Sequence, residues 1–132
     1  MKHRQEGFTL IELLTVMLIV GLLAGLAANR YWSVKERVFK VAMRQDLRNV
    51  ATQQERYFEK NMTYAASIDD LLDFEPSPSV TITITWGEKS GWAAIGTHAS
   101  LPDEQKCGLF YGPAPGGSAD PATISGTVAC VE

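Results

Sequence analysis

The chain has 132 residues, of which 12 are basic and 15 acidic, so its formal net charge is −3 at neutral pH. A chain of this length has room for one domain. The slight acidic excess argues against a strong general affinity for nucleic acid, because such affinity depends on neutralising phosphates with Lys and Arg.

A short basic and polar head, residues 1–6, precedes a long apolar segment, residues 8–28, which contains a single ionisable side chain, Glu12. An α-helix of these 21 residues would rise roughly 31 Å, about the hydrocarbon thickness of a bilayer. The basic head favours a cytoplasmic N-terminus, with the C-terminal body outside. Since a secretory signal has a shorter apolar core followed by its cleavage site, we expect this segment to be retained.

The carboxylate of Glu12 requires an explanation within such a segment. A charge at the centre of a bilayer costs on the order of 2.5–3.5 kcal/mol on insertion scales, and intramembrane charges usually have a partner. Residues 8–28 contain no basic side chain. If the chain were cut between Gly7 and Phe8, the new α-amino group would lie at the membrane depth of Glu12. An amine produced in this way is therefore a candidate partner for the carboxylate.

Residues 7–13 read Gly-Phe-Thr-Leu-Ile-Glu-Leu. This sequence resembles the cleavage and N-methylation motif of type IV pilins and of their type II secretion relatives, the pseudopilins. The resemblance is dense over the first 25 or so residues and weaker as far as Leu72. It implies that a prepilin peptidase cuts after Gly7 and methylates Phe8, and that Glu12 acts in assembly.

Two glycines, Gly21 and Gly25, interrupt the apolar segment. Each lowers helix propensity by about 1 kcal/mol relative to alanine in water. The resemblance implies that this part of the helix loosens when a subunit enters a filament. Alternatively, glycine is simply common in membrane helices.

The helix is predicted to continue over residues 29–62, which contain neither proline nor glycine. Apolar side chains recur there at helical spacing and predict a face that packs on a small sheet: Phe39, Met43, Leu47, Val50 and Tyr57. An adjacent stripe is expected to belong to the same core: Val34, Val38, Val41 and Ala42. The charged residues between these positions, Asp46 among them, are expected on a solvated outer face.

Residues 63–79 are predicted to form a loop. Ser67 precedes a short acidic and apolar run and is expected to cap a single helical turn, because acidic side chains are favourable at the positive end of a helix. Asp69, Asp70 and Asp73 could alternatively hold calcium, since some secretion pseudopilins bind calcium in this half of the molecule. A solvated helix start is the simpler interpretation.

The C-terminal half predicts a small antiparallel sheet. Residues 80–86 alternate strictly between apolar and polar side chains, which places Ile82, Ile84 and Trp86 on the helix and the threonines outward. Three further strands are expected, over residues 92–97, 109–111 and 122–131. Trp86 and Trp92 flank the first turn and are expected to pair across the hairpin, although a sugar-stacking platform is the alternative. With the long helix, this sheet predicts the α+β class and the type IV pilin fold.

The two cysteines, Cys107 and Cys130, both lie in the last quarter of the chain. In an oxidising compartment they are expected to form one disulfide that closes a loop of about 24 residues and stabilises the fold by roughly 3 kcal/mol. Two buried thiols are the alternative. With only His98 nearby, the pair makes a poor zinc site.

The sequence predicts neither an enzyme nor a bound cofactor or metal. His98 has no nucleophile or carboxylate at a fixed spacing, and Ser118 and Ser125 lie among turn residues without a base. The sequence also contains no phosphate-binding glycine loop.

We therefore expect a structural subunit of a type IV pilus filament. Its parts are a leader (residues 1–7), a membrane and filament-core helix (8–28) and a head (29–132), which consists of helix (29–62), loop (63–79) and a disulfide-closed sheet region (80–132). The resemblance implies further copies in a helical filament, a prepilin peptidase, and an assembly platform with its ATPase. The precursor is expected in the inner membrane and the filament outside the cell. A pseudopilin, or a minor pilin that binds DNA or a surface at a tip, is the alternative.

Overall fold

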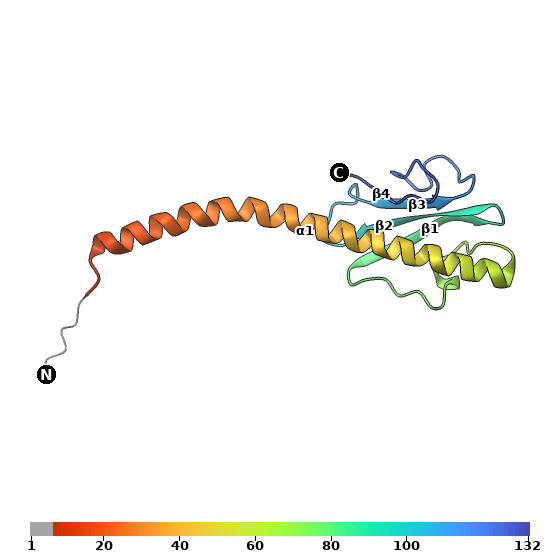
Figure 1. Ribbon diagram of the computed structural model, residues 1–132, viewed down its shortest axis with the longest axis horizontal. Coiled ribbons are helices and arrows are strands. Elements are labelled where there is room, and N and C mark those ends of the chain that lie inside the picture. The colour runs from red at the N-terminus through yellow and green to blue at the C-terminus, as the bar shows by residue number, and fades with distance from the viewer. Residues whose placement is uncertain (1–6) are drawn as a thin grey trace, which may run out of the picture. The chain divides into compact units, whose positions relative to one another are not determined.

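The computed structural model describes residues 7–132, apart from the side chain of Asn29. Its elements follow in this order: α1 (Leu10–Asn61), the short 3-10 helix η1 (Ile68–Asp70), β1 (Val80–Glu88), β2 (Gly91–His98), β3 (Cys107–Tyr111) and β4 (Ala129–Cys130) (Figure 1). The chain forms two compact units, Met1–Lys35 and Glu36–Glu132. Of the predicted leader, residues 1–6 lie outside the described part. The predicted α+β class is confirmed.

In the first unit, the helix begins at Leu10 rather than at Phe8 as predicted. Its large apolar side chains are exposed on every side of the helix, from Leu10 to Leu26. A helix that is apolar all round is stable only when something other than water surrounds it. Within the described residues, α1 is the one helix long and apolar enough to cross a membrane, as judged by length and composition alone.

In the second unit, four antiparallel strands form a sheet with the order β1-β2-β3-β4. Neighbours in sequence are therefore neighbours in the sheet, so short connections are sufficient. The turn between β1 and β2 consists of Lys89 and Ser90 only, because both strands run further into the predicted 87–91 turn than expected.

The second half of α1 packs on one face of this sheet. Met43, Leu47 and Val50 are each 0% exposed, and their side chains recur along one side of the helix, as predicted. They form one cluster with the inward side chains of the strands, which include Ile82, Ile84, Trp92, Ala94 and Leu109. Gly96 lets the helix come close, because an added Cβ there would lie 3.0 Å from Cδ1 of Ile82 and 3.6 Å from Cβ of Met43.

The adjacent valine stripe does not belong to this core, and its prediction as core is wrong. Val38 and Val41 are 59% and 60% exposed, and Val34 is exposed to a similar extent. A helix turns by about 100° per residue, so Val38 and Val41 point away from the side that carries Met43. The small sheet covers only that one side. Of the four residues predicted, Ala42 alone packs against the cluster.

Asp46 is buried, which contradicts its predicted place on the outer face. It is 2% exposed, and its two carboxylate oxygens accept hydrogen bonds from Ser77 N at 2.7 Å and Ser77 Oγ at 2.8 Å. Gln54 is also buried: Ala65 N donates to its Oε1 at 2.8 Å, and its Nε2 donates to Ala65 O at 3.0 Å. A buried polar group is tolerated when it is hydrogen-bonded. These two side chains fasten the loop 63–79 to the helix near both of its ends.

Trp86 does not lie on the helix face as predicted. A register shift falls between Ile84 and Trp86, so Thr85 is an extra residue and Trp86 pairs with Ala93. Directly opposed residues share a face of the sheet, and Ala93 neighbours the inward-facing Ala94. Trp86 is therefore on the outer face, half-buried, whereas Trp92 is part of the core.

The last strand is much shorter than the predicted strand 122–131. Only Ala129 and Cys130 pair with β3. Residues 122–128 form no strand, and Val128 packs against the core. The loop before them crosses the outer face, where Thr85 Oγ1 donates to Ser118 O. A Cβ on Gly108 would collide with Ala119 O, so this loop lies directly against the backbone of β3.

Tyr64 closes the open end of the core beside the helix terminus. Its ring stacks on Phe58, with ring centroids 4.6 Å apart, and its hydroxyl is 3.3 Å from Oε1 of Glu55. Burial, with the neighbouring Glu55 carboxylate, raises the pKa of Tyr64 above its ordinary value of 10.0. The folded state therefore holds the phenolic proton more tightly than the unfolded chain does.

We predict that Asp46→Ala lowers the free energy of unfolding by about 2–3 kcal/mol, because it removes a charged acceptor and leaves two donors of Ser77 unpaired. Urea unfolding of the full chain in detergent micelles, followed by tryptophan fluorescence, measures this change. Glu59→Ala, at an exposed site on the same helix, is the matched control and should change stability by less than about 0.5 kcal/mol. Equal unfolding midpoints for Asp46→Ala and the wild type would contradict the anchoring role.

The raised pKa of Tyr64 predicts an alkaline loss of stability. The stabilisation is fully present below pH 10 and is lost as the pH rises through the raised pKa, because the unfolded chain then releases the proton first. Tyr64→Phe should therefore lose less stability than the wild type between neutral pH and the pH range above 10. Tyr31→Phe, changed in the first unit, should follow the wild-type curve. Identical pH profiles for Tyr64→Phe and the wild type would exclude this effect.

Candidate assembly site at the helix start

The first turn of α1 is held by a reciprocal pair of side chains. Thr9 N donates to Oε2 of Glu12 at 2.9 Å, and Thr9 Oγ1 donates to the same oxygen at 3.0 Å. In return, Glu12 N donates to Thr9 Oγ1 at 3.3 Å. This is a capping box, in which a threonine before the helix and a glutamate three residues later satisfy each other's backbone N–H groups.

The same geometry leaves half of the Glu12 carboxylate free. Both bonds from Thr9 go to Oε2, and within the described residues Oε1 accepts no hydrogen bond. Neither of the two ion pairs in residues 7–132 involves Glu12. The side chain is exposed, as is Phe8, which is 86% exposed. A cation outside the described residues could therefore approach Oε1 without disturbing the cap.

The surroundings of Glu12 offer little other polarity. Thr15 turns its hydroxyl back to the helix and donates to the carbonyl oxygens of Ile11 and Glu12, both at 2.9 Å. In lipid, polar groups must be satisfied within the helix or by another protein. Thr15 meets this requirement within its own helix, and the Glu12 carboxylate meets it only in part.

Aromatic side chains follow the apolar segment. The rings of Tyr31 and Trp32 meet edge to face, with centroids 6.1 Å apart. Lys35 Nζ lies 4.7 Å and 5.5 Å from their respective centroids. Tyr, Trp and a nearby cation are typical of the boundary between lipid and water, so these residues fit one end of a membrane-spanning segment.

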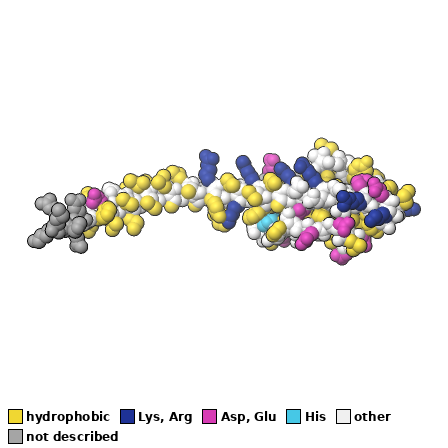
Figure 2. Space-filling view, turned by 60° about the horizontal axis from the view of Figure 1, so that its bottom comes forward, with side chains coloured by type: hydrophobic (Ala, Val, Ile, Leu, Met, Phe, Trp, Pro, Cys, Tyr) yellow, Lys and Arg dark blue, Asp and Glu magenta, His cyan; other side chains and the backbone are white. Residues whose placement is uncertain are grey.

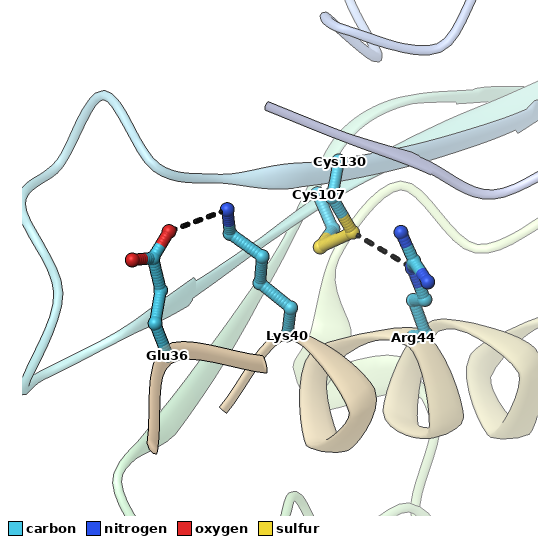
Figure 3. Close-up of a disulfide and its surroundings, with 5 residues drawn as sticks. All are labelled: Glu36, Lys40, Arg44, Cys107 and Cys130. Carbon is cyan, nitrogen blue, oxygen red and sulfur yellow. Dashed lines mark hydrogen bonds and ion pairs between the residues drawn. A yellow bond between two sulfur atoms is a disulfide. The ribbon is translucent and has the colours of Figure 1, made fainter. Parts of the chain in front are cut away.

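The structure joins Cys107 and Cys130 in a disulfide, at opposed positions of β3 and β4 (Figure 3). The bridge fastens a strand that has only two residues of its own. Arg44 Nε lies 3.2 Å from Sγ of Cys130, so the bridge also rests against the helix.

On the same helix, Lys40 Nζ lies 2.7 Å from Oε1 of Glu36. This hydrogen bond holds the pKa of the Glu36 carboxyl below its ordinary value of 4.5.

Of the other candidate residues, His98 lies in the core and three aspartates lie at the surface. His98 is buried, stacks on Phe39 at 4.1 Å between centroids, and accepts a bond from Ser100 N at Nδ1. Asp69, Asp70 and Asp73 are exposed. In residues 7–132 no group of three or more His, Cys, Asp or Glu side chains is placed to hold a metal ion.

One open groove of about 540 Å³ lies between α1, β3 and the segment 126–128. Arg48 and Glu55 line it from the helix, and Trp92 and Tyr111 line it from the sheet. Its lining contains neither His, Cys nor Ser.

Three residues that matter in the structure were not singled out by the sequence analysis. Thr9 could have been found, because Thr-x-x-Glu before an apolar run is the signature of a capping box. Asp46 and Gln54 carry no such signal, since charged and amide residues on a helix are mostly exposed. Their partners, Ser77 and Ala65, are fixed only when the loop folds back.

A family model for the prokaryotic N-terminal methylation motif matches residues 2–28. This motif belongs to structural, pilin-type chains and not to an enzyme family. A search of curated proteins found no match. The matched residues include the Gly7–Phe8 junction and Glu12, and they cover the apolar part of α1. The chain thus carries the N-terminal methylation motif at the head of one long helix packed on a small antiparallel sheet, the combination that characterises type IV pilins and pseudopilins.

Proposed function

We propose that the chain is the precursor of a type IV pilus subunit. A prepilin peptidase cuts after Gly7, which removes residues 1–7, and methylates the new N-terminal Phe8. Residues 8–28 then anchor the subunit in the inner membrane and later line the filament core, and residues 29–132 form the head. The match to the N-terminal methylation motif over residues 2–28 supports this processing.

The free oxygen of Glu12 is the observation that carries the proposal. Oε1 has no partner within the described residues, while Oε2 is fixed by Thr9. Cleavage creates an ammonium group on Phe8, and an intramembrane carboxylate is stabilised by a cation. The amine of a neighbouring copy can pair with Oε1 while the capping box remains intact. Such pairing would fix the axial register between adjacent helices.

The exposed surface of the first unit supports the proposal of filament assembly. Long apolar side chains cover it on all sides, and in a filament these side chains exchange lipid for contacts with other helices. The energy for extraction from the membrane comes from a partner ATPase through an assembly platform. The heads then face the solvent outside the cell.

The alternative is a pseudopilin of a type II secretion system, which has the same kind of N-terminal cleavage and methylation motif. The disulfide-closed C-terminal region of this chain favours the pilus subunit. Calcium binding would favour the pseudopilin, and Asp69, Asp70 and Asp73 form no metal-holding group in the described part of the chain. Titrating the full chain with calcium separates the two, since a stoichiometric site would favour the pseudopilin.

We predict that Glu12→Gln is inserted and cleaved like the wild type but reaches the sheared filament fraction at a level lower by about tenfold or more, because burying an ammonium group without its partner costs several kcal/mol. Glutamine keeps the capping box, since Gln serves at this position as Glu does. Glu12→Ala, which loses both functions, should also be inserted and cleaved but assemble poorly. Quantifying processed protein in the sheared and membrane fractions measures these effects.

Thr9→Ala is the matched control, because it removes the capping partner and leaves the charge of Glu12 in place. It should weaken the first helical turn by about 1 kcal/mol and still enter filaments. If Glu12→Gln assembled as well as the wild type while Thr9→Ala did not, Glu12 would act as a helix cap and the pairing mechanism would be wrong.

A further inference from the structure

We propose that the outward helix face around Val38 and Val41 is a docking surface for the acidic loop around Leu72 of a second copy of this chain. The proposal rests on the proposed function, because it names which surfaces of neighbouring heads meet in the filament. Both surfaces lie in the second unit, and their apolar centres, Val38 and Val41 on the helix and Leu72 on the loop, are exposed.

The helix face consists of apolar side chains flanked by arginines. Val38 and Val41 are more than half exposed, and Arg37, Arg44 and Arg48 are exposed beside them. Residues 37, 41, 44 and 48 are spaced four, three and four apart, so they lie along one side of the helix. The ion pairs in residues 7–132 are Lys40–Glu36 and Lys106–Asp120, so none of the three arginines has a carboxylate partner there.

The loop presents the opposite arrangement. Leu72 is 92% exposed at its centre, although burying a leucine side chain away from water is favourable. Four exposed carboxylates surround it in sequence: Asp69, Asp70, Asp73 and Glu75. None of them forms an ion pair within the described residues. Behind Leu72, the side chains of Ile68 and Phe74 line a groove of about 460 Å³ against β1.

Over the whole head, the helical part is also basic and the remaining part acidic. Residues 29–61 carry eight basic and four acidic side chains, whereas residues 62–132 carry two basic and nine acidic. Figure 2 shows basic side chains spaced along the helix, and most of the acidic ones, together with some basic ones, at the globular end. Complementary potentials of this kind favour association and set its register. Each surface has an apolar centre with a charged rim, the usual anatomy of a protein interface.

The two surfaces cannot satisfy each other within one copy. Ser77, at the end of the loop, is bound to Asp46, and Asp46 lies roughly 160° around the helix axis from Arg48, given 3.6 residues per turn. The loop is therefore held on the far side of the helix from the arginines. A contact between two different surfaces repeats from copy to copy, which generates an open polymer when the rotation does not close.

Charge reversal on each surface tests the proposal in cells that express the full chain. The loop variant is Asp69→Lys with Asp73→Lys, and the helix variant is Arg37→Glu with Arg48→Glu. Each should reduce the processed protein in the sheared filament fraction by about tenfold or more, because like charges across an interface cost several kcal/mol. Combining all four substitutions should restore filaments, since the charges are then exchanged.

Asp103→Lys with Glu104→Lys is the matched control, because it reverses two exposed charges elsewhere on the head. It should assemble like the wild type. If the loop variant equals this control, or if the combined variant stays defective, the proposal is overturned. Absence of processed wild-type filaments would instead overturn the proposed function, so the two failures are distinguishable.

Cross-linking provides a readout that does not depend on the yield of the charge variants. Leu72→Cys combined with Val41→Cys should give a ladder of disulfide-linked copies in oxidised filaments. Leu72→Cys combined with Thr83→Cys, which places the second thiol on exposed β1, should not. Equal ladders from both pairs, or none from either, would overturn the docking surface.

If the helix variant assembled normally but lost binding to a duplex DNA oligonucleotide, the arginine face would be a nucleic-acid surface and the proposal would be wrong.

Discussion

Glu12 introduces a negative charge into an apolar helix, and the proposed function depends on how that charge is satisfied. Within its own helix, the carboxylate is satisfied on one oxygen only, by the backbone N–H and hydroxyl of Thr9. A helix cap needs no charge, because glutamine performs the same task. In an apolar environment the charge of a glutamate at this position would be stabilised further by a cation at its second oxygen. The amine that cleavage would create at Phe8 has the right charge and the right depth.

The continuous helix connects this site to the head and serves two different environments. Its first part is apolar on all sides, and its second part is apolar on the single side that meets the sheet. The head therefore has a core of its own, built from Met43, Leu47 and Val50 against the strands. The disulfide between Cys107 and Cys130 fastens the last two-residue strand to this core. The opposite side of the helix stays uncovered and is available to other copies.

The helix and the first hairpin could be predicted because their signals are local. The stretch 29–62, which lacks proline and glycine, predicted the end of α1 to within one residue, and strict alternation located β1. The buried or exposed state of a stripe is not local. Val38 and Val41 have the spacing of a core, but the sheet is too small to reach them. The prediction for Trp86 was wrong because a single extra residue, Thr85, moves the following side chains to the other face.

At the candidate site, the sequence predicted roles for three residues, which stay predictions, but not the geometry of their side chains. The motif identifies Gly7, Phe8 and Glu12. The difference between the two carboxylate oxygens of Glu12, of which only Oε2 is bound by Thr9, is seen only in the folded first turn. The loop anchors Asp46 and Gln54 could not be predicted, because their partners are 31 and 11 residues away in the chain.

The most direct measurement is the intact mass, with N-terminal fragmentation, of protein sheared from the surface of cells that express the full chain. We predict a chain that begins at methylated Phe8, with a mass lower by two hydrogens for the bridge between Cys107 and Cys130. Recovery of that species in the sheared fraction would support a processed pilus subunit. A chain that still begins at Met1 would contradict cleavage, and with it the pairing of Glu12.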